Sequence, residues 1–353
     1  MSGLNISSVR SPEFPEDYVY EVEMSNDNIT VRLTNFGASI IRIDQPDQYG
    51  VKRNIVAGFK DIGDYRDNPY YLGCILGRYA GRISNAQFEL NNKAVQLSKN
   101  DGAHHLHGGA EGFSKKVWVI KNLIKEQDQV GVIMEYLSLD GEEGYPGNLW
   151  TQIKYTLDED NLLAITYNAV SDQVTPVSLS NHSYFNLSGF DEPHILRHVL
   201  QVNADYYTAK TDAHLPTGEI CTVAATSLDF KTAKIIGDNI GDFSDDSGYN
   251  HNFILNDYEE GKAKLAVTLT DPDSGRFVQV YTDQPCVQIY TANAWDSKII
   301  GSQGIPYGQH GAVAIETQFY PDAPNHPGFP KPYLYPGDHY KTKTIYAIGV
   351  EEH

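Results

Sequence analysis

The alternation of apolar and polar residues is the feature that most constrains the fold of this chain. The segments "VRLTNFGASIIRI", "LLAITYNAV", "HVLQVNADYYTA" and "LAVTLTDPDSGRFVQVYT" alternate in this way or are rich in β-branched and aromatic residues. Successive side chains of a β-strand point to opposite faces, so a period of two is typical of strands buried on one face. The chain has 24 tyrosines and 13 phenylalanines but only 3 methionines, a composition that suits pleated sheets better than helices.

Turn signals between these segments predict hairpins. In "FELNNKAVQL" the polar Asn91-Asn92-Lys93 separates two alternating stretches, and "DPDSG", residues 271–275, separates two others. Helical windows are few and short, and "TAKIIGDNIGD" is one of them. No linker, repeat or low-complexity tract divides the 353 residues. We therefore expect an all-β fold, a large β-sandwich with few short helices, as a single domain over residues 1–353 that begins with a polar extension of about 18 residues.

The charge balance and the cysteines limit the classes of partner. Lys+Arg 27 against Asp+Glu 46 gives a formal charge of -19, which repels the phosphates of nucleic acids and anionic membranes. Cys74, Cys221 and Cys286 are odd in number and widely spaced, which favours reduced thiols. The N-terminal stretch lacks the apolar core of a secretory signal, and no apolar run approaches the roughly 20 residues of a membrane span. We expect a cytoplasmic monomer or homodimer that binds neither nucleic acid nor membrane.

The stretch "NDGAHHLHGG" concentrates three histidines within four positions, followed by two glycines. On a strand, His105 and His107 would share a face, as in metal sites completed by Glu316 or His182. Alternatively, the glycines mark a backbone bend, and His104 and His105 are exposed turn residues. His107 follows Leu106 at the bend and is the best candidate to point into a pocket.

A second polar cluster is "TPVSLSNHSYFNLSG", residues 175–189. Alternation places Ser180, His182 and Tyr184 on one face of a strand. His182 thus lies beside an aromatic ring and a hydroxyl, an environment that suits a tuned imidazole. The alternative is a core histidine that is satisfied by a neighbouring hydroxyl.

Glu316 follows "AVAI", a small apolar run that is typical of a buried strand. A carboxylate there is costly to desolvate unless it is paired or has a chemical role, and an ion pair with an arginine is the alternative. The proline-rich "YPDAPNHPGFP" that follows cannot join a central sheet and is expected to form an ordered surface loop.

Two arginines lie among small residues in "LGRYAGRIS". The guanidinium groups of Arg78 and Arg82 can fork hydrogen bonds to hydroxyls or a carboxylate, although either residue can equally be a solvated strand residue. Neither a P-loop, nor a dinucleotide-type glycine pattern, nor a G-x-S-x-G motif occurs. Phosphate-loop and hydrolase interpretations therefore lack support.

Taken together, these stretches resemble the galactose mutarotase (aldose 1-epimerase) family. The similarity runs in order through "LTNFGASIIRIDQPDQYG", "GRYAGRI", "NDGAHHLHGGAEGF", "NHSYFNLSG", "LPTGEI", "PCVQIYTAN", "AIETQFYPDAPNHPGFP" and "LYPGDHYKTKTIYAI". Each piece is weak alone, but the ordered set covers nearly the whole chain. The resemblance implies a galactose mutarotase-like supersandwich with an open cleft for one free aldose, and neither a metal nor a cofactor.

The resemblance also implies roles for single residues. Glu316 matches the family's general base, His182 its general acid, and His107 the second histidine beside the ring oxygen of the sugar. Arg82 and Gln288 match groups that hold sugar hydroxyls.

Aromatic residues complete the implied site. Tyr184 and Phe185 are the aromatic residues nearest in sequence and are expected to pack against the C–H face of the sugar. Two positions depart from the family's pattern. Asn250 stands where an aspartate is usual, so a charged contact to the sugar is lost, and Gly81 stands where many relatives carry an asparagine. The preferred aldose is thus left open.

A hemiacetal ring opens when its anomeric hydroxyl loses a proton while the ring oxygen gains one. The expected mechanism has ionised Glu316 as the base and protonated His182 as the acid, since opposite charges stabilise each other at short range. Alternatives are an enzyme for a modified sugar or a non-sugar hemiacetal, a non-catalytic sugar-binding protein, and a metal-dependent enzyme using His105, His107 and Glu316.

Overall fold

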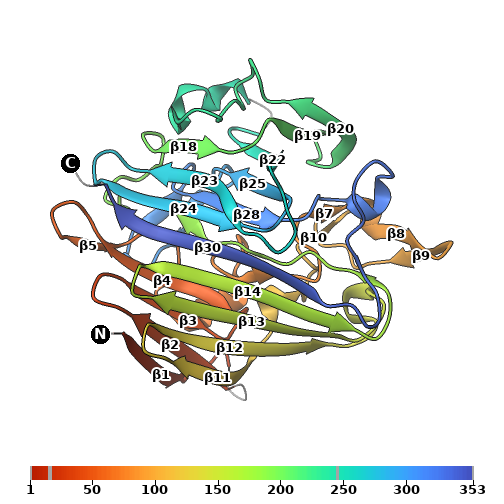
Figure 1. Cartoon of the computed structure of the whole chain (residues 1–353), viewed down its shortest axis with the longest axis horizontal. Helices are drawn as coiled ribbons and strands as arrows, with labels where there is room; N and C mark the ends of the chain where they lie inside the picture. The colour runs from red at the N-terminus through yellow and green to blue at the C-terminus, as the bar shows by residue number, and fades with distance from the viewer. Residues whose placement is uncertain (1, 15–17, 244–245, 352–353) are drawn as a thin grey trace.

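The computed structural model describes residues 2–14, 18–243 and 246–351. Two layers of antiparallel strands pack face to face (Figure 1). One layer is a single sheet of nine strands in the order β11 (Val119–Lys125), β12 (Gln129–Ser138), β13 (Leu149–Asp158), β14 (Leu162–Ser171), β30 (Tyr340–Val350), β24 (Arg276–Thr282), β23 (Lys264–Thr270), β18 (Val199–Val202) and β21 (Lys234–Ile235).

The second layer consists of two sheets. The first has the order β1 (Gly3–Val9), β2 (Val19–Ser25), β3 (Thr30–Thr34), β4 (Ser39–Pro46) and β5 (Lys52–Asn54). The second has the order β17 (Tyr184–Phe185), β28 (Val313–Gln318), β25 (Cys286–Tyr290), β22 (Asn250–Ile254), β19 (Tyr206–Lys210) and β20 (Pro216–Thr222). A bridge between Val56 and Phe185 joins the two sheets.

One hydrophobic core connects all three sheets. It contains Ile40 of β4, Val132 of β12, Ile165 of β14 and Val313 of β28. In β13 buried and half-buried residues alternate without exception, since one face of the strand packs on this core. The alternation in the sequence thus correctly predicted a β-sandwich.

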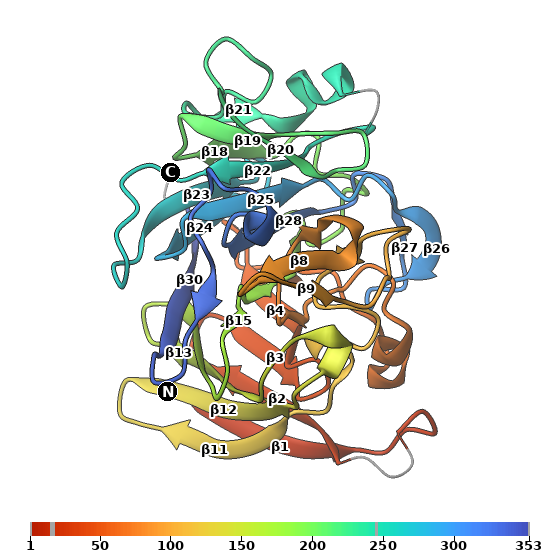
Figure 2. The same cartoon turned by 90° about the vertical axis from the view of Figure 1, so that its right-hand side faces the viewer.

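Short elements lie outside the three large sheets (Figure 2). The small two-stranded sheets are β7 (Arg82–Ile83) with β10 (His105–Leu106), β6 (Ile75–Leu76) with β16 (Ser180–Asn181), β8 (Gln87–Leu90) with β9 (Lys93–Gln96), β15 (Thr175–Pro176) with β29 (Tyr333–Leu334), and β26 (Asp296–Ile300) with β27 (Pro306–Gly308). The helices of the described residues are 3-10 turns, η1 (Ile62–Asp67), η2 (Ser84–Ala86), η3 (Phe113–Lys115), η4 (Glu142–Gly144), η5 (Ile236–Asp238), η6 (Ile240–Asp242) and η7 (Ala323–Asn325). None of the described helices is long and apolar enough to cross a membrane.

Both predicted hairpins are confirmed. Asn91 and Asn92 join β8 to β9 and both have positive φ, which asparagine tolerates. Residues 271–275 join β23 to β24. The segment "TAKIIGDNIGD" supplies β21 and the turns η5 and η6, as its short helical window suggested. The polar N-terminal stretch is more than an extension, because its residues 3–9 form the edge strand β1 along β2.

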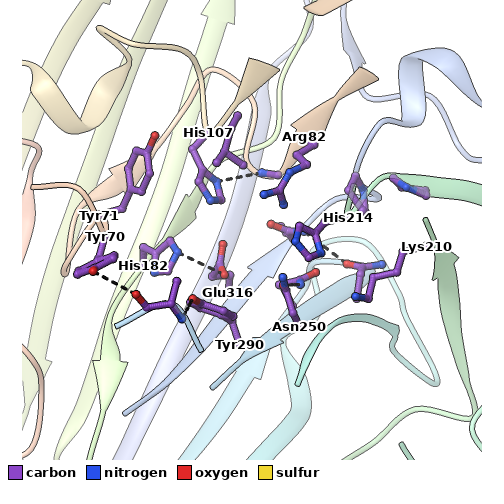
Figure 3. Close-up of a pocket in the computed structure, with 18 of the residues that line it drawn as sticks. Tyr70, Tyr71, Arg82, His107, His182, Lys210, His214, Asn250, Tyr290 and Glu316 are labelled. Atoms are coloured by element: carbon purple, nitrogen blue, oxygen red, sulfur yellow. Dashed lines mark hydrogen bonds and ion pairs between the residues drawn. The ribbon is translucent and has the colours of Figure 1, made fainter. Parts of the chain in front are cut away.

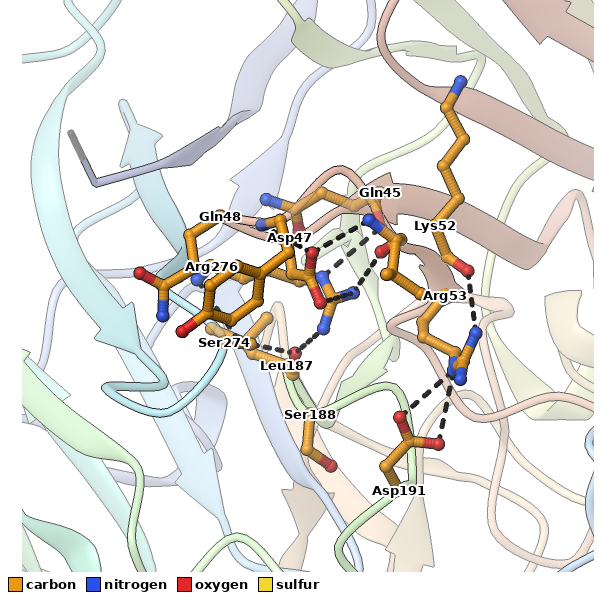
Figure 4. A network of polar contacts seen from close by, with 12 residues as sticks. Gln45, Asp47, Gln48, Lys52, Arg53, Leu187, Ser188, Asp191, Ser274 and Arg276 are labelled. Atoms are coloured by element: carbon orange, nitrogen blue, oxygen red, sulfur yellow. Dashed lines mark hydrogen bonds and ion pairs between the residues drawn. The ribbon is translucent and has the colours of Figure 1, made fainter. Parts of the chain in front are cut away.

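A buried arginine ties the two layers together near the turn between β4 and β5 (Figure 4). Arg276 of β24 is 1% exposed and donates hydrogen bonds to the carbonyl oxygens of Gln45, Val51 and Leu187. Leu187 follows β17 in the chain, and His182, which precedes β17, belongs to the site described below. The arginine therefore fixes this part of the backbone relative to the nine-stranded sheet.

Candidate active site

A cavity of about 250 Å³ lies over the six-stranded sheet (Figure 3). Seven of the site residues expected from the sequence line it, namely Glu316, His182, His107, Arg82, Asn250, Gln288 and Tyr184. These residues come from strands and turns that are far apart in the sequence, and the fold brings their side chains together. Their roles remain predictions.

Four neighbouring strands form the floor of this cavity, and each contributes two residues that are two positions apart. The pairs are Glu316 and Gln318 of β28, Gln288 and Tyr290 of β25, Asn250 and Asn252 of β22, and Thr208 and Lys210 of β19. Residues two apart on a strand share a face, so one polar face of the sheet makes the floor. The register places Gln288 directly between Glu316 and Asn252.

Glu316 and His182 form a deeply buried pair of ionisable groups in the cavity. Their exposed fractions are 2% and 3%, and His182 Nε2 lies 3.5 Å from Glu316 Oε1. Glu316 Oε2 and His182 Nδ1 have no hydrogen-bond partner among the described residues. Buried polar atoms without partners are rare in folded proteins, and at a cavity they indicate a place where a ligand supplies the missing bonds.

Burial shifts the pKa of both groups of this pair, against the ion pair expected from the sequence. Desolvation raises the pKa of Glu316 to about 8, and the nearby Arg82 opposes this shift. Desolvation lowers the pKa of His182 to about 3. At neutral pH the free pair therefore holds one proton, and that proton is on Glu316 instead of His182.

The tautomer of His107 is fixed by the backbone. His107 Nδ1 accepts a hydrogen bond of 3.1 Å from the amide of Gly81, so the ring proton of the neutral imidazole is on Nε2. Burial and the neighbouring His182 hold the pKa of His107 well below its ordinary value. His107 itself has a φ of 53°, and Gly108 follows with a φ of 93°. Position 108 requires glycine, because a Cβ there would lie 1.7 Å from the Gly77 carbonyl oxygen. The predicted bend is confirmed, and it turns His107 into the cavity.

Two polar contacts orient further groups of the cavity. Asp101 Oδ2 accepts a hydrogen bond of 2.6 Å from Arg82 Nε, and no other described residue is bonded to the remaining guanidinium nitrogens. Gln288 Nε2 donates to Asn250 Oδ1 at 2.7 Å. Because the oxygen of Asn250 faces Gln288, its Nδ2 remains as a donor for a ligand.

Aromatic rings form one wall of the cavity. Tyr184 stacks on His182 with ring centroids 4.7 Å apart, as their shared strand face predicted. Tyr71 meets His107 edge-on at 4.9 Å. The cavity is also lined by Tyr70 and Tyr290, which sequence reasoning missed together with Tyr71. Such rings pack well against the C–H groups of a sugar.

Comparison with known proteins shows the family of this chain. A family model described as aldose 1-epimerase matches residues 20–347. Galactose mutarotase from Bos taurus is 36% identical over 332 residues, 94% of both chains, and aldose 1-epimerase from Escherichia coli (strain K12) is 36% identical over 335 residues, 93% of this chain and 94% of that protein.

The chain belongs to the aldose 1-epimerase family. Among solved structures, galactose 1-epimerase from Lactobacillus acidophilus NCFM superposes with a TM-score of 0.87 at 28% identity and full coverage of both chains. The aldose epimerase homologue from C. elegans gives a TM-score of 0.85 at 26% identity, again with full coverage. The resemblance in the sequence motifs and the expected mutarotase-like β-sandwich are both confirmed.

Three expectations for single residues of this aldose 1-epimerase family member are wrong. His105 is buried instead of exposed, since its Nδ1 contacts the Ser98 carbonyl oxygen at 2.7 Å and its Nε2 the Tyr145 hydroxyl at 2.8 Å. Phe185 does not face the cavity, because it alternates with Tyr184 and points into the main core. Arg78, which was expected either to bind hydroxyls or a carboxylate or to be a solvated strand residue, is instead buried and structural.

The bonds of Arg78 show this structural role. Its guanidinium donates to Ser138 and to the carbonyl oxygens of Leu139 and Pro146. His104 is half-buried, and its Nδ1 accepts a hydrogen bond from the amide of Asn85. Neither residue lines the cavity.

The metal-site interpretation also changes with the structure. His105 is not part of such a set, but ligand atoms of His107, His182 and Glu316 lie within 4.8 Å of one another, and among the described residues these three are the group that could hold a metal. The tautomer of His107 disfavours such a site, because the nitrogen left for a metal carries the ring proton. The arrangement suits donation of a hydrogen bond better than coordination.

Proposed function

We propose that this protein interconverts the α and β anomers of a free aldose of the galactose or glucose type, as a cofactor-independent isomerase. The observation that carries this proposal is the buried Glu316–His182 pair, which holds one proton between two groups 3.5 Å apart. Opening a hemiacetal requires one proton to leave the C1 oxygen and one to reach the ring oxygen. A pair that shares a single proton can do both.

The two positions of this proton correspond to the two forms of the substrate. With the proton on His182, the carboxylate of Glu316 is ready to accept the C1-hydroxyl proton of the closed sugar. As that proton moves to Glu316, the bond between C1 and the ring oxygen breaks, and His182 protonates the ring oxygen. Glu316 is then protonated and His182 neutral, which is the arrangement that burial favours in the free protein.

Reclosure runs the same transfers in reverse. Rotation about the C1–C2 bond of the open aldehyde presents its other face to the ring hydroxyl. His182 takes the proton of that hydroxyl, and Glu316 returns a proton to the C1 oxygen. General acid and general base each contribute about 10² to 10⁴-fold to such reactions.

The other residues bind and orient the sugar in this proposal. His107 donates from Nε2 to the ring oxygen. The free nitrogens of Arg82, the amide of Gln288 and Nδ2 of Asn250 hold hydroxyls, while Tyr184 packs beside the ring. Arg82 also stabilises the carboxylate form of Glu316, since it lowers the pKa that burial raises.

The structure gives specific support for this function over pure binding. A binding protein has no need for a carboxyl and an imidazole that are both almost fully buried and lack partners at Glu316 Oε2 and His182 Nδ1. Such groups cost stability, and proteins keep them mainly at functional sites. That the protein acts in the cytoplasm, as a monomer or homodimer, without a nucleic-acid partner, and as a single domain over residues 1–353, stays a prediction.

Polarimetry of freshly dissolved α-D-galactose and α-D-glucose tests the proposal. The protein is expected to speed the approach of both rotations to their equilibrium values at nanomolar to micromolar concentration. A rate equal to that of buffer for both sugars would contradict it.

A further inference from the structure

The end of the cavity remote from Glu316 contains a second charged cluster. Lys210 of β19 and His214 of the following turn line the cavity (Figure 3), and the side chains of both contact Asp246. The Lys210 ammonium donates to Asp246 Oδ2, and His214 Nδ1 lies 3.0 Å from Oδ1. The side chains of Lys210 and Asp246 are only 14% and 3% exposed. The proposed anomerisation uses none of these three residues.

This cluster lies farther from Glu316 than one sugar ring extends. Lys210 is on β19 and Glu316 is on β28, and the order in the sheet is β28, β25, β22, β19. Three spacings of about 4.8 Å between neighbouring strands place β19 about 14 Å from β28. A pyranose extends only about 6 Å from O1 to O4, because the five bonds of about 1.5 Å between these atoms follow a bent path. A sugar with C1 at Glu316 therefore leaves space for a substituent toward Lys210.

The groups that face this space are mainly hydrogen-bond donors. Lysine carries three N–H bonds, and Asp246 is the one hydrogen-bond partner of Lys210 among the described residues. Nδ2 of Asn250 is also directed away from Gln288 as a donor. Asp246 contacts both Lys210 and His214, so one carboxylate faces two side-chain nitrogen atoms. Neutral hydroxyls would be served equally well by amides, which are less costly to bury than an ammonium group.

We propose that this cluster, Lys210, His214 and Asp246, is a subsite for an anionic substituent of the sugar, a carboxylate or a phosphate at the end remote from C1. Asp246 holds the two donors in place and the anion accepts hydrogen bonds from Lys210 and Asn250. This inference rests on the proposed function, and it specifies acidic aldoses as the substrate class. The local donors oppose the general repulsion of anions by a chain of charge -19.

The test compares exchange between the two anomers of D-galactose, D-galacturonate and D-glucose 6-phosphate, measured by NMR exchange spectroscopy. Lys210→Met keeps the length of the side chain and removes its charge. His214→Asn is the second variant, because asparagine tolerates the φ of 60° at this position. Lys231→Met, at an exposed lysine outside the cavity that pairs with Asp205, is the matched control.

The wild type is expected to act on at least one acidic sugar, and Lys210→Met should lower kcat/KM for it about 10- to 100-fold more than for D-galactose. His214→Asn should shift the preference in the same direction, and the control should leave it unchanged. Comparison of the two acidic sugars distinguishes the carboxylate from the phosphate.

Two results would overturn the inference and leave the proposed function intact. One is activity on D-galactose with none on either acidic sugar. The other is an equal loss for neutral and acidic sugars in both variants. Absence of exchange for all three sugars would instead remove the proposed function and, with it, this inference.

Discussion

Gly81 and His107 bind each other through two hydrogen bonds. The amide of Gly81 donates to His107 Nδ1 at 3.1 Å, and the amide of His107 donates to the Gly81 carbonyl oxygen at 3.0 Å. The pair fixes both the position of the imidazole and its tautomer. His107 can therefore donate a hydrogen bond from Nε2 but cannot serve as a base through that atom.

We expect the neutral Nε2–H tautomer of His107 to persist across the pH range in which the protein is folded. Burial holds the pKa of this imidazole well below its ordinary value, so it does not become charged near neutral pH. Long-range proton–nitrogen NMR correlations of the histidine rings report the tautomer directly. A signal pattern of Nδ1–H, or of the doubly protonated ring at pH 7, would contradict this assignment.

Glu316→Gln is expected to stabilise the fold, increasingly as the pH rises. The pKa of Glu316 is raised from 4.5 to about 8, so below pH 4.5 the carboxyl is protonated in both the folded and unfolded states. Between these values the unfolded state ionises and the folded state does not, which destabilises the wild type by up to roughly 1.4 kcal/mol per pH unit. Glutamine does not titrate.

The measurement is the free energy of unfolding by denaturant at several pH values. The difference between Glu316→Gln and wild type should grow between pH 4.5 and about 8 and then become constant. A difference that is independent of pH would show that Glu316 is not held in its protonated form by burial.

Much of the fold follows from local pattern, because one buried face imposes alternation on every long strand. The hairpin of β8 and β9 was predictable for a similar reason, since Asn91 and Asn92 tolerate the backbone of a tight turn. His105 was misassigned because its partner Tyr145 lies 40 positions away in the sequence. A turn-like sequence does not reveal which ring will be covered by a distant loop.

The candidate catalytic residues were predicted from a resemblance to a family, and the structure adds how they are placed. Glu316, His182 and His107 reach one cavity from β28, from the residues between β16 and β17, and from the bend after β10. The cluster of Lys210 and Asp246 was missed, because these residues form no recognisable motif and meet only through β19 and a loop. The sequence did contain a signal for Lys210. Thr208 and Lys210 are two positions apart on a strand, like the other pairs of residues that form the floor of the cavity.

Asn250→Asp is expected to move the alkaline limit of activity to higher pH. Asn250 is on β22, the second strand from that of Glu316, and it accepts a hydrogen bond from Gln288, whose register partner is Glu316. A carboxylate at position 250 therefore opposes ionisation of Glu316. The wild-type kcat/KM should fall as the pH rises through about 8, because the Glu316–His182 pair then loses its single proton.

The pH profile of kcat/KM for D-galactose, taken for wild type and Asn250→Asp, measures this shift. Asn250→Ser, which removes the amide without adding charge, controls for lost hydrogen bonds. An alkaline limit that stays in place or moves to lower pH in the aspartate variant would show that position 250 does not act on Glu316 electrostatically.

Treatment with a chelator is expected to leave activity unchanged. The residues able to hold a metal, His107, His182 and Glu316, are those assigned here to proton transfer and hydrogen bonding. Dialysis against EDTA, followed by polarimetry before and after addition of Zn²⁺ or Mn²⁺, separates the alternatives. Activity that is lost on dialysis and restored by metal would replace acid–base catalysis with metal-assisted ring opening.

The most direct measurement of the central claim is polarimetry of freshly dissolved α-D-galactose with wild type and Glu316→Gln in parallel. Glu135→Gln, at a carboxylate of β12 that pairs with Lys121 outside the cavity, is the matched control. We expect wild type and Glu135→Gln to accelerate the change in rotation equally, and Glu316→Gln to lose almost all activity while binding of the sugar, measured by calorimetry, is largely kept. A Glu316→Gln variant that retains more than about a tenth of wild-type turnover, well short of the 10² to 10⁴-fold effect of a general base, would contradict the assignment of Glu316 as that base.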